Sequence, residues 1–202
     1  MSKWNPEQND YNKIAEVYNV NKEIVSSVID ETIFVRRGKT FEPSKNHLSL
    51  LFKGALYAYG TEDNERKVKC LISNTFYENY FAPVEYDDEH LKNKIKPDKY
   101  DNAINESNMI IKASSDSYIF QINIKKLSET TNGIGNIIKR IIQDYYIEFP
   151  RIANELHEIM QINNIGKRKN YVMGKYPNLS QEYDQNIIAD FFGARAMAWY
   201  TT

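Results

Sequence analysis

The chain has 202 residues, of which 42% are hydrophobic and 26% charged, and its formal net charge is -1. This composition excludes a disordered chain, and the length suits one large domain or two small ones, either of which can bury a core. The near-zero charge excludes a global attraction to nucleic acid or membranes, so any DNA binding must come from a local patch.

The sequence contains one cysteine and no recognisable targeting segment. Cys70 excludes an internal disulfide framework, and we interpret it as a small buried thiol in a reducing cytoplasm. The N-terminal residues MSKWNPEQND are polar, and nowhere do about 18 apolar residues follow one another. We therefore predict a cytoplasmic protein without a membrane span or a membrane partner.

Two kinds of pattern occupy the N-terminal part of the chain. Residues 11–30 have apolar side chains at the spacing of one or two short amphipathic helices. Residues 31–41 are rich in strand-forming residues and include a turn at Gly38 and Lys39. Helices followed by strands are thus expected before residue 42.

Short strands are predicted next. Residues 47–73 predict a strand, Gly54, a second strand, a polar turn with Gly60 and a third strand. A polar segment follows, and residues 108–127 predict two more strands joined by a Ser/Asp turn. Short strands with turns between them are typical of an antiparallel barrel or roll, which together with the helices gives an α+β fold.

After this roll the apolar spacing becomes helical over roughly seven turns. Pro150 lies within the helical stripe and predicts a kink or a split there. A stripe of this length lies along a large core or pairs with a second copy, and the roll is too small to cover it. We therefore predict a homodimer whose interface contains Ile134, Ile138, Ile141, Tyr145, Ile152 and Leu156.

The C-terminal residues predict a hinge and then a helix-turn-helix. In DQNIIADFFG, Asp184 is a candidate N-cap, Ala189 is small where helices approach, and Gly193 serves the bend. The second helix would be ARAMAWYTT, in which only Arg195 is a strong reader of bases or phosphates. We interpret Trp199 and Tyr200 as core aromatics. The packing face of the first helix would contain Ile187, Ile188, Phe191 and Phe192.

Basic residues near the C-terminus are the candidate DNA contacts. Between residues 167 and 202 they outnumber the acidic ones, Glu182, Asp184 and Asp190. The densest cluster, GKRKN at residues 166–170, is interpreted as a solvated turn at the hinge rather than a phosphate clamp. The DNA-binding candidates are Lys167, Arg168, Lys169, Lys175 and Arg195.

Three segments, taken in order, carry a family resemblance: FVRRGKTF, LFKGALYAYGTEDNERKVKCLIS and KYPNLSQEYDQNIIADFFG. The chain resembles the Crp/Fnr-type bacterial transcriptional regulators, especially the short forms common in Bacteroidetes. The resemblance implies a cyclic-nucleotide-binding-like jelly roll with N-terminal helices over residues 1–132. It further implies a dimerisation helix over residues 133–162 and a reduced helix-turn-helix-like domain over residues 163–202.

The best-known members of this family hold a cyclic nucleotide with a Gly-Glu pair and an Arg-Ser/Thr-Ala cluster. The matching stretch here, residues 80–114, contains no glycine, and Glu106, Ser107 and Asn108 stand where the Arg cluster is expected. Carboxylates also outnumber lysines between Glu85 and Glu106, which disfavours a phosphate anion. We predict no cofactor and a degenerate effector pocket, with Glu85, Ser107 and Asn108 as its remaining candidates.

The sequence shows no motif for an iron–sulfur cluster, another metal site or an enzyme active site. The lone Cys70 cannot supply an iron–sulfur cluster, and His47, His90 and His157 show no metal-ligand spacing. No nucleophile–base motif, P-loop or dinucleotide fingerprint occurs, so we predict no enzyme activity and no metal site. The predicted function is a dimeric Crp/Fnr-like regulator that binds double-stranded DNA through a short reading helix. The alternative is a non-DNA-binding ligand-sensing or protein-interaction module derived from that family.

Overall fold

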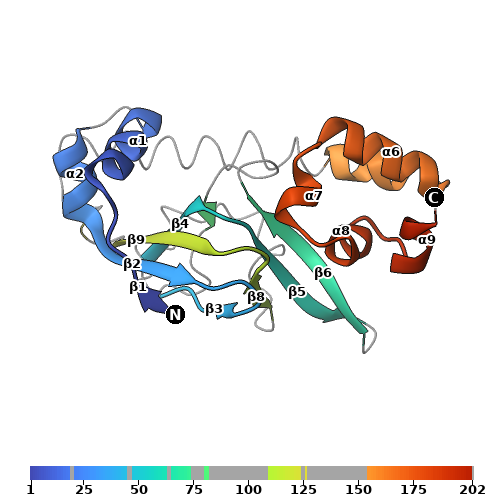
Figure 1. The fold of residues 1–202 in the computed structure, drawn as a ribbon, viewed down its shortest axis with the longest axis horizontal. Helices are drawn as coiled ribbons and strands as arrows, with labels where there is room; N and C mark the ends of the chain where they lie inside the picture. Colours follow the sequence, from blue (N-terminus) through green and yellow to red (C-terminus); the bar gives the residue numbers. More distant parts are fainter. Residues whose placement is uncertain are drawn as a thin grey trace.

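The computed structural model describes residues 1–18, 21–44, 47–62, 65–73, 80–81, 109–123, 126 and 154–201. Strands occupy the middle of this part of the chain, and helices lie at both ends of the molecule (Figure 1). The N-terminal and strand elements are β1 (Ser2–Lys3), α1 (Gln8–Tyr18), α2 (Lys22–Val28), β2 (Ile29–Val35), β3 (Thr40–Phe41), β4 (His47–Lys53), β5 (Leu56–Glu62), β6 (Glu65–Ile72), β7 (Tyr80–Phe81), β8 (Ile110–Ala113) and β9 (Ser117–Asn123). The C-terminal helices are α6 (Ile165–Lys175), α7 (Leu179–Glu182), α8 (Gln185–Phe191) and α9 (Ala196–Tyr200), and residues 154–160 are also helical.

The strands form two antiparallel sheets, with the orders β1-β2-β9-β4-β7 and β3-β8-β5-β6. Apolar side chains from both sheets meet in one core, which confirms the predicted roll and the α+β class. Gly60 lies within β5 rather than in a turn, which corrects the sequence-based expectation. The inner core contains Ile33, Val35, Phe41, Leu51, Leu56, Ala58, Ile72, Ile111, Ala113 and Ile119.

The corner between β4 and β5 requires a glycine. Gly54 has a φ of 102°, and a Cβ atom there would lie 2.5 Å from the carbonyl oxygen of Asp116 and 2.7 Å from the Cα of Ser117. Both the left-handed backbone and the contact with a neighbouring main chain exclude a larger residue. The Lys-Gly pair of the sequence thus marks the place where the chain passes from one sheet to the other.

The outer faces of the two sheets are covered by different helices. Helices α1 and α2 lie on the β2-β9-β4 sheet, where Ile14 and Val25 pack against Leu50 and Phe120. This confirms the short N-terminal helices. At the opposite end of the molecule the C-terminal helices lie beside β5 and β6 (Figure 1). The roll is therefore covered on one side by its N-terminal helices and on the other by the chain's C-terminus.

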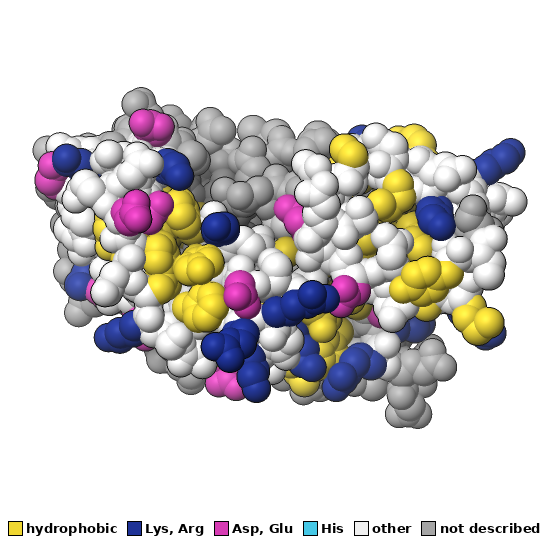
Figure 2. All heavy atoms as spheres, viewed as in Figure 1, with side chains coloured by type: hydrophobic (Ala, Val, Ile, Leu, Met, Phe, Trp, Pro, Cys, Tyr) yellow, Lys and Arg dark blue, Asp and Glu magenta, His cyan; other side chains and the backbone are white. Residues whose placement is uncertain are grey.

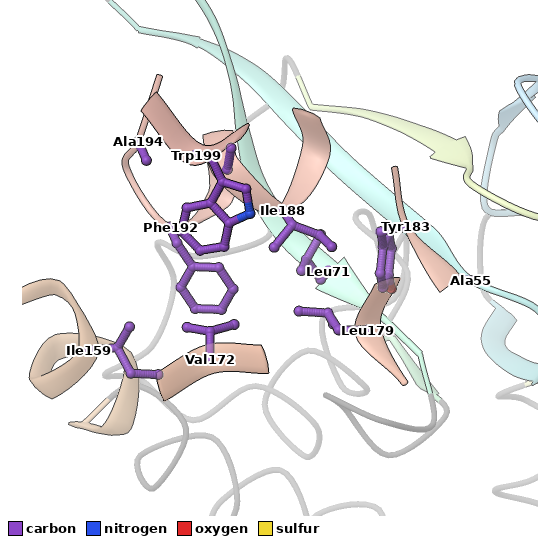
Figure 3. Close-up of a cluster of buried hydrophobic side chains, with 11 residues drawn as sticks. Ala55, Leu71, Ile159, Val172, Leu179, Tyr183, Ile188, Phe192, Ala194 and Trp199 are labelled. Carbon is purple, nitrogen blue, oxygen red and sulfur yellow. The ribbon is translucent and has the colours of Figure 1, made fainter. Parts of the chain in front are cut away.

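A second core joins the C-terminal helices to the roll. Ala55 and Leu71 of the roll pack with Leu179, Tyr183 and other buried side chains of the helices (Figure 3). Along β5 the side chains alternate, so that Leu56 and Ala58 face the inner core while Tyr57 faces the helices. We call residues 154–201 the C-terminal unit.

Candidate nucleic-acid interface

Helices α8 and α9 are joined by a tight bend at Gly193. The φ of Gly193 is 67°, and the N–H of Ala194 donates to the carbonyl of Ala189 at 2.8 Å. Ala189 and Phe192 are buried, as the helix-turn-helix pattern predicts. This hydrogen bond closes the end of α8 and turns the chain into α9.

The bend packs around Trp199. Its side chain is fully buried, stacks on Phe192 with ring centroids 6.2 Å apart, and donates from Nε1 to Gln185 at 3.0 Å (Figure 3). The core position predicted for Trp199 is confirmed. The same prediction for Tyr200 is wrong, since this residue is 57% exposed. Successive helical residues point in different directions, so burial of Trp199 turns Tyr200 toward solvent.

The basic residues predicted to contact DNA have different environments. Residues 166–170, expected as a solvated turn, lie within α6. Arg168 is only 8% exposed, and its guanidinium donates to the carbonyl of Phe192 at 2.6 Å, of Ile162 at 2.8 and 3.0 Å, and of Met160 at 3.2 Å. These donors hold the bend of the helix-turn-helix against the end of the preceding helix. The geometry therefore gives Arg168 a structural role, in place of the DNA contact expected from the sequence.

Two further candidate contacts are also engaged inside the unit. Lys169 donates from Nζ to the carbonyl of Trp199 at 2.7 Å, and Lys175 forms an ion pair with Glu155 at 2.6 Å. Lys167 and Arg195 are exposed and have no ion pair with any of the residues the structure describes. Of the five basic candidates, these two combine an exposed side chain with a charge that no ion pair among the described residues compensates.

The three acidic residues after residue 160 all bond to the roll. Glu182 accepts a hydrogen bond from Ser73 Oγ at 2.7 Å, and Asp190 accepts one from the Val68 N–H at 2.7 Å. Asp184 pairs with Arg37 at 2.7 Å. The C-terminal unit thus directs this part of its negative charge toward the roll. Sequence order could not indicate this arrangement, because each partner lies more than a hundred residues away in the chain.

The environments of Asp184 and Tyr183 complete this docking contact. Asp184 occupies the N-cap position of α8, as predicted, but its side chain forms no capping hydrogen bond and is directed to Arg37. The Tyr183 hydroxyl donates to the carbonyl of Leu56 at 3.1 Å. Burial raises the pKa of Tyr183 well above its usual value, so the phenol stays protonated and keeps its donor.

The predicted effector and dimer residues fall largely outside the described residues. This is the case for Glu85, Ser107, Asn108, Ile134, Ile138, Ile141, Tyr145 and Ile152. Leu156 is described, and together with the buried Ile159 it packs against the core of the C-terminal unit. This end of the apolar stripe contributes to the chain's own core, and the dimer contact of Leu156 stays a prediction.

Cys70 and the described histidines are the other side chains with possible chemistry. Cys70 is half-buried rather than fully buried as predicted, and desolvation raises the pKa of its thiol to about 12, which keeps it protonated at neutral pH. His47 contacts Asp30 at 3.1 Å, and His157 lies 3.4 Å from Gln161. Within the described ranges, no group of His, Cys, Asp or Glu is placed to hold a metal ion. None of the helices in this part of the chain is long and apolar enough to cross a membrane.

A β-roll followed by a helix-turn-helix unit is the fold of the Crp/Fnr-type regulators, and this chain has that fold. It is similar to FixK2 from Bradyrhizobium japonicum, with 10% identity and a TM-score of 0.56 over 84% of this chain and 80% of that one. It is also similar to a putative transcriptional regulator of the Crp/Fnr family from Eubacterium rectale, with 12% identity and a TM-score of 0.58 over 94% and 85% of the two chains. A third similar structure is a CooA mutant from Carboxydothermus hydrogenoformans, with 6% identity and a TM-score of 0.58 over 99% and 84%. No protein-family model and no curated protein matches the sequence.

Proposed function

We propose that the chain is a dimeric transcription regulator of the Crp/Fnr type that binds double-stranded DNA through α8 and α9. The observation that carries the proposal is the helix pair itself, in which α8 is packed on the roll while Arg195, Met197 and Tyr200 of the α9 segment are exposed. A reading helix needs this free outer face. The bonds of Glu182, Asp184 and Asp190 to the roll support the proposal, because carboxylates engaged with other groups repel phosphates less.

The dimer and the effector pocket belong to the same proposal. A homodimer formed along residues 133–162 would place two copies of the helix-turn-helix on one duplex. The roll over residues 1–132 would have a degenerate pocket at Glu85, Ser107 and Asn108, without a cyclic nucleotide bound in the family's manner. Residues 163–202 would form the DNA-binding domain.

The test is the salt dependence of binding to a random duplex, measured by fluorescence anisotropy. We expect binding at low ionic strength, with a logarithmic affinity that falls linearly with the logarithm of salt concentration. Arg195→Ala and Lys167→Ala should each reduce the slope by about 1. Lys22→Ala, on the exposed side of α2, removes the same charge far from the helix-turn-helix and should change nothing. No binding by the wild type at low salt overturns the proposal.

The exposed side chains of α9 favour a second candidate function. Met197 is 81% exposed and Tyr200 57%, and apolar and aromatic residues of this kind are enriched at protein interfaces. The chain would then be a protein-interaction module derived from the same fold. Two results together would favour this candidate over the regulator: the wild type does not bind DNA, and Met197→Asp changes its self-association.

A further inference from the structure

The C-terminal unit alone offers few charges to a duplex. Arg168, Lys169 and Lys175 are engaged internally, so Lys167 and Arg195 are the two candidate cations that are exposed and have no ion pair in the described part of the chain. Non-specific affinity for DNA grows with the number of neutralised phosphates, and a working site engages several. Further cations near the helix-turn-helix would therefore increase its affinity for DNA.

Such cations lie on the roll, on the outer side of the β3-β8-β5-β6 sheet and at the turn that joins β2 of the other sheet to β3. We call this set the basic strip: Arg36, Arg37, Lys39, Arg66 and Lys112. Gly38, with a φ of 77°, forms the turn that carries the first three residues. Lys and Arg side chains gather along the lower middle of the molecule in Figure 2, over the strands beside the C-terminal unit.

The basic strip adjoins the start of α8. Arg37 pairs with Asp184, the N-cap residue of that helix. On the sheet, the ring of Tyr57 packs against the C-terminal unit and lies 6.1 Å from the ring of Tyr59. The cationic groups of Arg66 and Lys112 lie 4.1 and 5.7 Å from the Tyr59 ring. The strip and the helix-turn-helix therefore form one continuous surface.

The charges of the strip are available to a partner. Arg36, Lys39 and Arg66 are exposed, and the stacking on Tyr59 leaves the guanidinium edge of Arg66 free for hydrogen bonds. Asp184 pairs with the guanidinium of Arg37, and Asp116 accepts from the backbone N–H of Arg37 at 2.8 Å. A polyanion approaching this surface would thus meet Arg36, Lys39 and Arg66, which are exposed and have no ion pair within the part of the chain that the structure describes.

We propose that the basic strip contacts the phosphates of the duplex that flanks the segment held by α8 and α9. This inference rests on the proposed DNA-binding function. In helix-turn-helix complexes the first helix crosses the sugar–phosphate backbone, and here that helix begins at the Arg37–Asp184 pair. A backbone that crosses α8 at this end continues over the β2–β3 turn and β8.

The experiment compares the double variant R36Q/K39Q with the matched control K13Q/K22Q, whose exposed lysines lie on α1 and α2 over the other sheet. Salt slopes are measured on duplexes of about 12 and about 30 base pairs, the shorter covering little more than one half-site. We expect R36Q/K39Q to lower the slope by about 2 on the long duplex only. The control should behave as wild type on both duplexes.

The outcomes separate the two proposals. Equal slopes for R36Q/K39Q and the wild type on the long duplex, with Arg195→Ala still effective, overturn the role of the strip alone. Equal losses in R36Q/K39Q and K13Q/K22Q also overturn it, because net charge would then explain the effect. Absence of wild-type binding overturns the DNA-binding function itself. Unchanged circular dichroism and melting of both variants ensure that a loss reports on contacts.

Discussion

The carboxylate of Asp190, in the first helix of the helix-turn-helix, accepts a hydrogen bond of 2.7 Å from the backbone N–H of Val68 on β6. Among the strands that the structure describes, β6 stands at the end of its sheet, where outward-facing backbone groups have none of these strands as a partner. One side chain therefore both satisfies an edge donor and fixes α8 on the roll.

Replacing Asp190 should loosen this contact. We expect Asp190→Ala to lower the free energy of unfolding by about 1–3 kcal/mol, because it leaves a partly buried N–H without an acceptor. Asp190→Asn keeps an acceptor oxygen and should retain most of the stability. Urea unfolding measures both, and equal stability of the Ala variant and the wild type would contradict the structural role.

Arg168 should be far more sensitive than its neighbour Lys167. Arg168→Met removes charged hydrogen bonds to the carbonyls of Met160, Ile162 and Phe192, and we expect a loss of about 2–4 kcal/mol. Lys cannot reproduce the planar fork, so Arg168→Lys should rescue little of this. Lys167→Met, one position away and exposed, should change stability by less than about 0.5 kcal/mol. Similar losses in both Met variants would refute the assignment.

Because of Asp30, the free energy of unfolding should decrease at acidic pH. The hydrogen bond from Lys126, helped by those from Asn123 and His47, outweighs burial and lowers the pKa of Asp30 to about 2 from 3.8. A lowered carboxyl pKa stabilises the fold above the unfolded pKa, and this stability is lost as the pH falls from about 4 toward 2. Its size is about 2 kcal/mol. Thermal melting of wild type and Asp30→Asn should therefore converge near pH 2, and a constant difference across this range would disprove the linkage.

Two glycines with positive φ offer a matched pair. A Cβ atom at Gly54 meets main-chain atoms of Asp116 and Ser117, whereas one at Gly38 meets nothing within 4 Å. We expect Gly38→Ala to cost about 1 kcal/mol for its backbone conformation, and Gly54→Ala to cost about 3 kcal/mol or more because the clash is added. Chemical unfolding compares them, and equal costs would mean that the corner can shift.

The proposed dimer is tested by a charge in the apolar stripe. Ile138→Asp should produce monomers in analytical ultracentrifugation, because a buried unpaired carboxylate is unfavourable at an interface. Lys139→Asp places the same charge next to it, off the stripe, and serves as the control. A dimer that persists in the Ile138 variant would exclude this interface.

Local sequence patterns were sufficient to predict the order of the elements and the helix-turn-helix. The alternation of apolar and polar residues in the strands, Gly54 and the Ile-Ala-x-Phe-Phe-Gly segment all involve residues that are neighbours in the sequence. These patterns were insufficient to predict which charged side chains are buried or paired. Arg168 lies in the same basic run as Lys167, and only the packing of distant carbonyls distinguishes the two. The partners of Glu182 and Asp190 likewise come from β6 and the residue that follows it, so tertiary contacts decided where the negative charge of the C-terminus points.

Because side chains alternate along β5 and β6, these strands contribute to two of the hydrophobic cores, one on each face of their sheet. Leu56 and Ile72 fill the interior of the roll, while Tyr57 and Leu71, their neighbours in the same strands, support the helix-turn-helix. Packed interiors have little free volume, so a larger side chain inside the roll displaces β5 and β6. Helix α8 packs on β6 and would move with it. Ala58→Val, in the inner core, should therefore lower the melting temperature followed by Trp199 fluorescence in a Trp4→Phe background as well as that of the strands.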